Sequence, residues 1–221
     1  MNNQKTTDSI LLIGDLHGLF YDYRQILKNL KPAMSIALGD IGIGFDPNKE
    51  LVLNDIPGIH KILRGNHDSP TEFRKHPNNI GDYGILHGEF IDGLFDKLFF
   101  LSGAWSIDKE QRTEGIDWWA DEQLSYEELS DAVNLHNKEQ PDLVIAHDCP
   151  TSVLLLMHPY NVIPTRTSQA LDIMIQNHKP SYFIFAHHHK SWRKNIDGCL
   201  YICLNELEFL DISKRITGGN I

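Results

Sequence analysis

The stretch Ser9-Ile-Leu-Leu-Ile-Gly-Asp-Leu-His-Gly18 decides the fold. Residues 9–13 form a short apolar run, which is typical of a buried strand, and Gly14 and Asp15 end it abruptly. Asp15 and His17 are two positions apart, and in extended backbone two such side chains point to the same side. They could therefore bind one cation together, although an Asp at this place alone would equally suit the cap of a following helix.

Four further polar segments also follow apolar runs that we predict as strands. They are Gly39-Asp40 after 33–38, Gly65-Asn66-His67-Asp68 after 59–63, His147-Asp148 after 143–146, and His187-His188-His189 after 182–186. Strands this apolar are typical of an α/β protein in which both faces of the sheet are covered. Open α/β sheets place their sites at the carboxyl ends of strands. We therefore expect the five segments to meet in one site.

Between these strands, hydrophobic spacing predicts helices over 19–30, 126–137 and 167–178. Ser125 is the expected cap of the second helix, and Thr167 or Ser168 of the third. Residues 98–101 are a further strand, and 200–204 with 207–212 are predicted to form a closing hairpin. We expect one domain over residues 1–221, with a flexible N-terminus over 1–8.

The types of side chain in these segments predict a site for two metal ions. The carboxylate of Asp40 could bridge two cations about 3.5–4 Å apart, although Asp40 alone would also suit a turn. The amide oxygen of Asn66 could bind the second cation, and His67 could face the substrate. Asp68 could then orient the His67 imidazole and favour its protonated form. The alternative is an Asx-turn with an incidental histidine.

Histidines after the two later strands complete the candidate ligands. His147 follows one strand, and His187 and His189 form another pair two positions apart. Because alternate side chains of an extended segment point in opposite directions, we expect His188 to point away and not to be a ligand.

The five motifs, in this order, resemble those of the calcineurin-like metallophosphoesterase superfamily: D-x-H, G-D, G-N-H-[D/E], H and G-H-x-H. They span residues 14–189 and thus nearly the whole chain. The resemblance implies a four-layer α/β/β/α sandwich with two mixed β-sheets and a dinuclear metal site at the carboxyl ends of the strands.

The resemblance also implies which residues hold each ion. Asp15, His17, Asp40 and His189 would hold the first cation, and Asp40, Asn66, His147 and His187 the second. The metals would be manganese first, with iron or zinc as alternatives. A hydroxide that bridges them would attack a phosphate mono- or diester, and His67 would be the general acid.

Two departures from the superfamily pattern are visible. Ala186 replaces the Gly of G-H-x-H, and a small residue is kept. The protein Ser/Thr phosphatase branch has a second Asp and an Arg after the bridging Asp, and residues 41–45 contain neither. The chain is therefore more similar to the compact bacterial and phage-type phosphoesterases, as the segment His147-Asp148-Cys149-Pro150 also indicates.

Composition narrows the partners and the compartment. The formal net charge of −10 disfavours a broad grip on a nucleic-acid backbone, so we expect a small phosphorylated substrate or a nucleotide instead of long nucleic acid. No apolar run reaches the roughly 18–20 residues of a membrane span. Three cysteines without framework spacing predict a reducing, cytoplasmic location, and Cys199 and Cys203 are expected in a buried strand.

Segments between the motifs are candidates for substrate selection. Trp105 and Arg112 lie in a stretch rich in tryptophan, residues 105–119, that could stack a base or hold a phosphate. The alternative is that these tryptophans pack under a long loop. Arg166 and the backbone amides around it could bind an anion, or could simply begin a helix.

Three other functions compete with a metal-dependent phosphoesterase. A nuclease or cyclic-nucleotide phosphodiesterase would use the same site, although the acidic charge weakens the nuclease. A scaffold of the same fold that has lost catalysis would be expected to lack His67. A zinc amide hydrolase would not need the Gly65-Asn66-His67-Asp68 segment.

Overall fold

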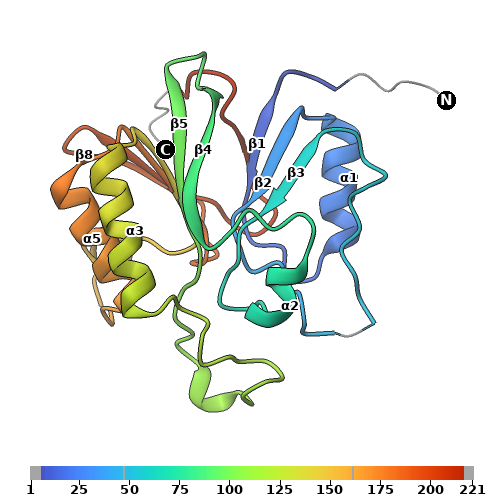
Figure 1. Ribbon diagram of the computed structural model, residues 1–221, viewed down its shortest axis with the longest axis horizontal. Helices are drawn as coiled ribbons and strands as arrows, with labels where there is room; N and C mark the ends of the chain where they lie inside the picture. Colours follow the sequence, from blue (N-terminus) through green and yellow to red (C-terminus); the bar gives the residue numbers. More distant parts are fainter. Residues whose placement is uncertain (1–5, 47, 161, 217–221) are drawn as a thin grey trace.

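Two β-sheets face each other at the centre of the molecule, with helices on their outer sides (Figure 1). The computed structural model describes residues 6–46, 48–160 and 162–216. Residues 1–5 of the predicted flexible segment lie outside this range. Helix α1 covers one sheet, and helices α3 and α5 cover the other, so the layers run α/β/β/α (Figure 1). The predicted four-layer sandwich is confirmed.

Both sheets are mixed. The first has the order β10 (Phe209–Asp211), β1 (Ile10–Ile13), β2 (Met34–Ala37), β3 (Ile59–Ile62), in which only β10 is antiparallel to its neighbour. The second has the order β4 (Tyr83–Phe90), β5 (Phe95–Leu101), β6 (Leu143–Ala146), β7 (Tyr182–Phe185), β9 (Cys199–Cys203), β8 (Trp192–Ile196). Its inner strands β5, β6, β7 and β9 are parallel, and β4 and β8 are antiparallel at the edges.

The helices lie between the strands in sequence. They are α1 (Phe20–Leu30), α2 (Pro70–Lys75), the 3₁₀ turn η1 (Lys109–Gln111), α3 (Tyr126–Glu139), α4 (Thr151–Met157) and α5 (Arg166–Asn177). Among the described residues, no helix has the length and apolar character needed to cross a bilayer.

Strand β1 shows why a central strand of this fold is apolar on both faces. Successive side chains of a strand point to opposite faces. Leu12 therefore packs between the sheets, while Leu11 and Ile13 pack against the helix side. On that side, Tyr23 and Leu27 of α1 are fully buried, four positions apart on one helix face. Apolar clusters between all adjacent layers thus hold the four layers together.

Two helix starts follow from capping. Ser125 caps α3 as predicted, and its side chain and that of Glu128 form a capping box. The helix predicted over 167–178 is present as α5, but its predicted cap was wrong. Thr165 is the cap, and Ser168 is the third residue of the helix.

The predicted closing hairpin does not form, because its two strands belong to different sheets. Strand β9 pairs with β7 and β8 in the second sheet, whereas β10 pairs with β1 in the first. The connection between them thus carries the chain from one sheet to the other. Strands β4 and β8 and helices α2 and α4 were not predicted, because the two strands are edge strands with many partly exposed residues and the two helices are short. Cys199 and Cys203 lie buried in β9, as expected.

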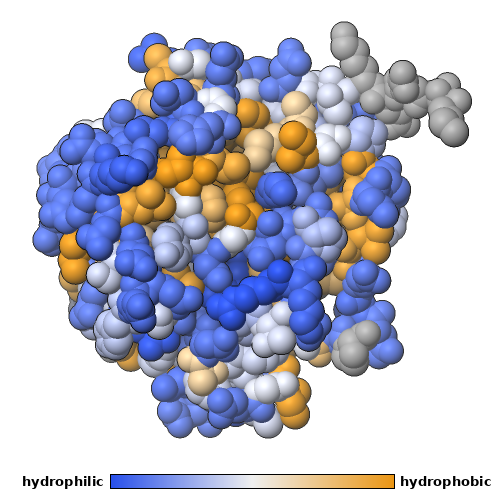
Figure 2. Space-filling view, viewed as in Figure 1, coloured by the Kyte–Doolittle hydropathy of each residue, from blue (hydrophilic) through white to orange (hydrophobic). Residues whose placement is uncertain are grey.

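The surface reflects this arrangement. The face in Figure 2 is mostly hydrophilic; apolar side chains gather in its upper middle, between α1 and α3, and again at the right, around α1. The loop after β5, which contains η1, extends at the end of the molecule towards which β1, β2 and β3 run (Figure 1). The polar segments that follow these strands lie at this end.

Candidate metal centre

The loops after β1 and β2 are joined by backbone hydrogen bonds, which fixes the first two polar segments against each other. The amides of Leu16 and His17 both donate to the Asp40 carbonyl, at 3.1 and 2.7 Å. Asp40 and His17 have positive φ values of 46° and 42°. Non-glycine residues rarely adopt this region, and such strain is concentrated at functional sites.

The structure brings the predicted ligands together in two groups. Ligand atoms of Asp15, His17, Asp40 and His189 lie within 4.8 Å of one another, and so do those of Asp40, His147 and His187. Asp40 belongs to both groups. The amide oxygen of Asn66 lies 3.1 Å from Nε2 of His147 and therefore beside the second group.

The reason for this convergence differs from the one the sequence suggested. His17, His187 and His189 all have positive φ values, so the Asp15–His17 and His187–His189 pairs are not extended. Backbone turns after the strand ends, instead of strand alternation, direct these side chains. His188 belongs to neither of the two groups and lies 3.4 Å from Asp148 Oδ1.

Glycines allow the two groups to approach closely. A Cβ on Gly39 would lie 2.2 Å from His147 Nδ1, and one on Gly65 would lie 2.1 Å from Asp40 Oδ1. Gly39 also has a φ of 111°, which other residues avoid. Both motif glycines are therefore required by the space that the Asp40 and His147 side chains occupy.

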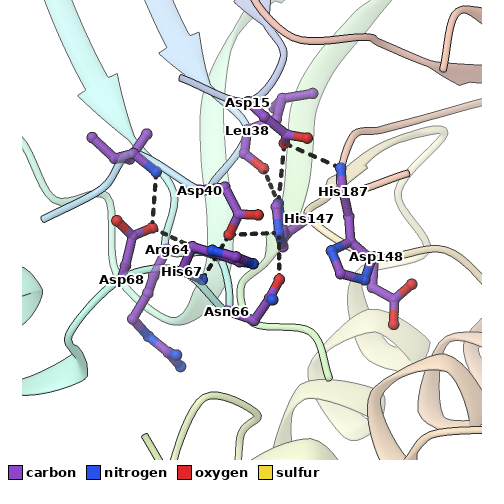
Figure 3. Close-up of polar contacts among 12 residues, drawn as sticks. Asp15, Leu38, Asp40, Arg64, Asn66, His67, Asp68, His147, Asp148 and His187 are labelled. Atoms are coloured by element: carbon purple, nitrogen blue, oxygen red, sulfur yellow. Dashed lines mark hydrogen bonds and ion pairs between the residues drawn. The ribbon is translucent and has the colours of Figure 1, made fainter. Parts of the chain in front are cut away.

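The second group places several acceptors around one point. Nδ1 of His147 donates to the Leu38 carbonyl at 2.7 Å, so Nε2 is the nitrogen directed at the site (Figure 3). Nε2 lies 3.1 Å from Asp40 Oδ1 and 3.1 Å from Asn66 Oδ1. The oxygens of Asp40 and Asn66 are hydrogen-bond acceptors without a proton of their own. They can lie this close to the same nitrogen only if a proton or a cation lies between them.

The pKa values of the buried groups also reflect this need for a positive charge. Burial lowers the pKa of His147, but Asp40 and Asp15 outweigh it and raise the value to about 9. Burial would raise the pKa of Asp40, but His147 holds it well below its usual range. Burial raises the pKa of Asp15 to about 7 and lowers that of His187 to about 3. Without a cation, protons on His147 and, near neutral pH, on Asp15 thus offset the buried negative charge.

Two buried atoms test whether a cation fits. Oδ2 of Asp15 and Nδ1 of His187 are buried and have no hydrogen-bond partner. Leaving a buried polar atom unpaired costs about 1–3 kcal/mol. One cation in each ligand group would satisfy both atoms. The chemistry of the donors also suits divalent manganese, iron or zinc, because imidazole and carboxylate ligands are mixed. The residues present therefore fit a metal centre.

A buried hydrogen-bond chain fixes the orientation of Asn66. Its Nδ2 donates to Ser106 Oγ at 2.9 Å, and Ser106 Oγ donates to Glu122 Oε2 at 2.6 Å. The other oxygen of Glu122 accepts from the Ser106 amide at 2.9 Å. Because Nδ2 is engaged, the amide oxygen of Asn66 must face His147 and Asp40. Nothing in the sequence pattern indicated Ser106 or Glu122, since neither follows a predicted strand directly.

His67 lies at the edge of the first group. Its ring is stacked on Phe45 at 5.6 Å and meets the His17 ring edge to face at 5.1 Å. Arg112 reaches it, with guanidinium nitrogens 2.9 and 3.1 Å from the ring nitrogens. Burial lowers the pKa of His67 to about 4; Asp40 opposes this and Arg112 adds to it.

Asp68 does not make the contact that we expected. Both of its oxygens accept from backbone amides, those of Ile41, Gly42, Ile43 and Gly65, at 2.8 to 3.1 Å. Asp68 therefore bonds to the loop after β2 and to the Gly65 amide after β3, and not to the His67 imidazole (Figure 3). The expectation was wrong because the sequence places Asp68 next to His67 but does not show where the following turn directs it.

The predicted substrate residues fall in different places. Arg112 reaches His67, and Trp105 lines a cleft next to His187. Arg166 is elsewhere: it donates to the Gln123 carbonyl at 3.1 Å and its guanidinium lies over Tyr126. The amides of Thr167 and Ser168 bond to side chains of Gln123 and Thr165. The backbone amides of the anion site expected there are thus already engaged, although Nε of Arg166 is buried without a partner.

Comparisons with solved structures agree with the fold. A dimetal phosphatase from Danio rerio has a TM-score of 0.56 at 14% identity, covering 92% of this chain and 89% of that one. The phosphopantetheinyl hydrolase of Mycobacterium tuberculosis has a TM-score of 0.51 at 11% identity, covering 92% and 95%. GAP50 of Plasmodium, an inner-membrane-complex anchor, has a TM-score of 0.51 at 12% identity, covering 91% and 72%. At such identities these likenesses concern the fold alone.

The sequence comparisons identify the family. No curated protein matches the chain. A family model described as calcineurin-like phosphoesterase matches residues 9–191, which include all five polar segments. The chain therefore belongs to the calcineurin-like phosphoesterase family, whose members are metal-dependent hydrolases of phosphoric esters.

Proposed function

We propose that this chain hydrolyses a small phosphorylated substrate or nucleotide, a phosphate mono- or diester, at a site for two cations. Asp15, His17, Asp40 and His189 would hold one, and Asp40, Asn66, His147 and His187 the other. The observation that carries the proposal is that Asp40 belongs to both groups of ligand atoms. A shared carboxylate is how two-metal hydrolases keep their ions close.

Two divalent cations, manganese first and iron or zinc as alternatives, would supply a nucleophile at neutral pH and positive charge opposite the phosphoryl oxygens. Arg112 would add to that charge, since it lies beside His67. Its ion pair with Asp108, at 2.7 Å, would hold the guanidinium in place. The three cysteines are unpaired, which supports a cytoplasmic location as part of the proposal.

His67 would donate a proton to the leaving oxygen. The ring is neutral at pH 7 in the free protein, because its pKa is lowered to about 4. An anionic phosphoester next to the ring would favour its protonated form. Phe45 on one face and Arg112 at the nitrogens would fix the ring plane. Asp68 would act as a positioning residue, since it ties the backbone after Asp40 to that of Gly65.

Hydrolysis of p-nitrophenyl phosphate and bis-p-nitrophenyl phosphate with Mn²⁺ tests the proposal. His67→Ala should lower kcat by roughly 10²–10⁴-fold, the usual contribution of a general acid, while the bound metal stays unchanged. His87→Ala, a histidine exposed on β4, is the matched control and should leave kcat unchanged. If His67→Ala turned over both esters at the wild-type rate, the role of His67 would be wrong. If the metal-loaded wild type hydrolysed no ester, the proposed function would be wrong.

A further inference from the structure

A cleft of about 320 Å³ opens directly beside the second ligand group, because His187 forms part of its wall. Clefts of this size bind small molecules. Its other walls include Trp105 from the loop after β5, Leu154 from α4, Ile163 from the segment before α5, and the polar side chains of His158 and Tyr160. The cleft is therefore a continuation of the candidate metal centre.

Some of the apolar side chains that line the cleft are exposed to solvent and are not part of the hydrophobic core. Ile107 and Ile163 line the cleft with exposed fractions of 72% and 50%. Large apolar side chains that gather at a site mark a surface for binding, whereas single ones scattered elsewhere need no explanation. A group bound here would cover Ile107, Ile163 and the face of Trp105.

The cleft offers no permanent positive charge to a second anionic group. Among the residues that the structure describes, no lysine or arginine lines it; His158 and His188 do, and the carboxylate of Asp148 lies 3.4 Å from His188. Lys109 and Arg166 line a separate cleft of about 480 Å³, which adjoins this one at Trp105, Ile163 and Thr165. The organic group that fits the apolar cleft is thus uncharged, and the face of Trp105 favours a planar ring.

A second, smaller pocket of about 120 Å³ lies at the other ligand group. His17, Phe45, Lys49 and His67 line it, and it shares no lining residue with the apolar cleft. The centre thus has room for one organic group beside the proposed acid, His67, and for another beside His187. A phosphomonoester carries one organic group, whereas a phosphodiester carries two.

We infer that the substrate is a phosphodiester: its leaving group lies at the His67 pocket, and its other substituent, an uncharged planar aromatic ring, lies in the apolar cleft against Trp105. This inference rests on the proposed function. Trp105 is well fixed for such a role, because the next residue, Ser106, donates both its amide and its hydroxyl to Glu122. The wall of the cleft and the Asn66 amide are thereby held by the same carboxylate.

Two diesters with the same leaving group test the inference: bis-p-nitrophenyl phosphate and methyl p-nitrophenyl phosphate. The ratio of their kcat/KM values measures how strongly the enzyme prefers one second substituent over the other. The two diesters also differ in intrinsic reactivity, but this difference is the same for every variant and drops out when the ratios of variant and wild type are compared. Trp105→Ala should reduce the preference for the aryl diester by roughly tenfold or more, mainly through KM, as expected when an apolar contact of this size is lost. Trp118→Ala is the matched control, since Trp118 lines the adjoining cleft but not the apolar one.

A filling variant gives a second measurement if Trp105→Ala does not fold. Ile163→Trp should narrow the cleft and lower kcat/KM for the aryl diester more than for the methyl diester. Ile173→Trp is its control, because Ile173 has a similar exposed fraction, 48%, but lies on α5 away from the cleft.

The outcomes separate the two proposals. An unchanged ratio in both Trp105→Ala and Ile163→Trp would overturn the inference, and so would hydrolysis of p-nitrophenyl phosphate without hydrolysis of either diester. Both of these results would leave the proposed phosphoesterase standing. No turnover of any ester by the metal-loaded wild type would overturn the proposed function as well.

Discussion

At the scale of single residues, the centre is built from atoms that accept hydrogen bonds but have few donors. Asp15 Oδ2 and His187 Nδ1 are buried without a partner, and Asn66 Oδ1 faces Nε2 of His147. Such an arrangement costs stability unless a positive charge occupies it. Binding of a cation should therefore stabilise the folded protein as well as supply its chemistry.

Ser106→Ala tests how the amide of Asn66 is held. The variant removes the acceptor that engages Asn66 Nδ2 and frees the amide to rotate. We expect about 10–100-fold weaker binding of the second cation, the usual effect of losing a group that orients a ligand. Isothermal titration with Mn²⁺ measures it without reference to activity.

Ser102→Ala is the matched control for that prediction. Ser102 is also buried and also bonds to a carboxylate, that of Asp82, but it does not contact Asn66. Equal Mn²⁺ affinities in the wild type and Ser106→Ala would show that the hydrogen-bond chain does not position Asn66.

The sequence pointed to the residues that follow buried strands, but it did not show which residues hold them in place by hydrogen bonds. Asp15, Asp40 and His147 could be picked out because a polar side chain after an apolar run needs an explanation. The partners of Asp68 could not, since they depend on the path of the loop after β2. Glu122 lies in a long loop with no pattern, and its carboxylate reaches Asn66 through Ser106.

At the scale of elements, the exit of each strand determines whether the ligands meet. After β3, Gly65 packs its backbone against the Asp40 carboxylate, so that any Cβ would lie 2.1 Å from Oδ1. Gly65→Ala should displace Asp40, lower Mn²⁺ binding and destabilise the fold by about 1–3 kcal/mol, as overpacking does.

Gly88→Ala on the edge strand β4 serves as the comparison, because its Cβ would meet only the side chain of Phe90, at 3.2 Å. Metal content and denaturant midpoints of the two variants measure the difference. Full Mn²⁺ binding by Gly65→Ala would contradict the account of the β3 exit.

Helix α3 contains a buried histidine that should make stability depend on pH. Both ring nitrogens of His136 are buried without partners, and burial, aided by His178, lowers its pKa from 6.5 to about 4. Because the unfolded chain binds this proton more readily, stability is present above pH 6.5 and is lost as the pH falls towards 4. Between pH 7 and pH 5 the loss should be about 2 kcal/mol.

His136→Leu should remove this part of the pH dependence, since leucine does not titrate. Urea unfolding of the wild type and the variant at both pH values gives the difference directly, and cation loss at low pH affects both proteins alike. Parallel declines in the two proteins would show that His136 is not the group responsible.

Elements with a strong pattern were predicted and those at edges were not. Strands β1, β6 and β7 are almost entirely buried and apolar, and β2 is interrupted only by the buried Ser35. Strand β3, Ile-His-Lys-Ile, is less apolar, and the Gly-Asn-His-Asp segment after it is what made it recognisable. Strand β8 is an edge strand of the sequence Trp-Arg-Lys-Asn-Ile, whose alternation is too weak to recognise. The partners of β9 and β10 depend on how the two sheets pack, which a local pattern cannot show.

At the scale of the whole molecule, the centre lies where the two sheets meet. Asp15, Asp40 and Asn66 follow strands of the first sheet, and His147 and His187 follow strands of the second. Either sheet alone would supply an incomplete set of ligands. The packing of Leu12 and Ile36 against Ile145 and Ile184 between the sheets therefore assembles the site. That residues 1–221 form one domain stays a prediction.

The metal content of the purified protein tests the central claim most directly. After dialysis against Mn²⁺ and removal of the free ion, elemental analysis should find two manganese ions per chain in the wild type. Asp40→Asn should lose most of both, because Asp40 belongs to both ligand groups, whereas Asp55→Asn, at the surface ion pair with Arg24, should keep both. A wild type with one ion or none, or an Asp40→Asn variant that keeps two, would contradict a centre of two cations bridged by Asp40.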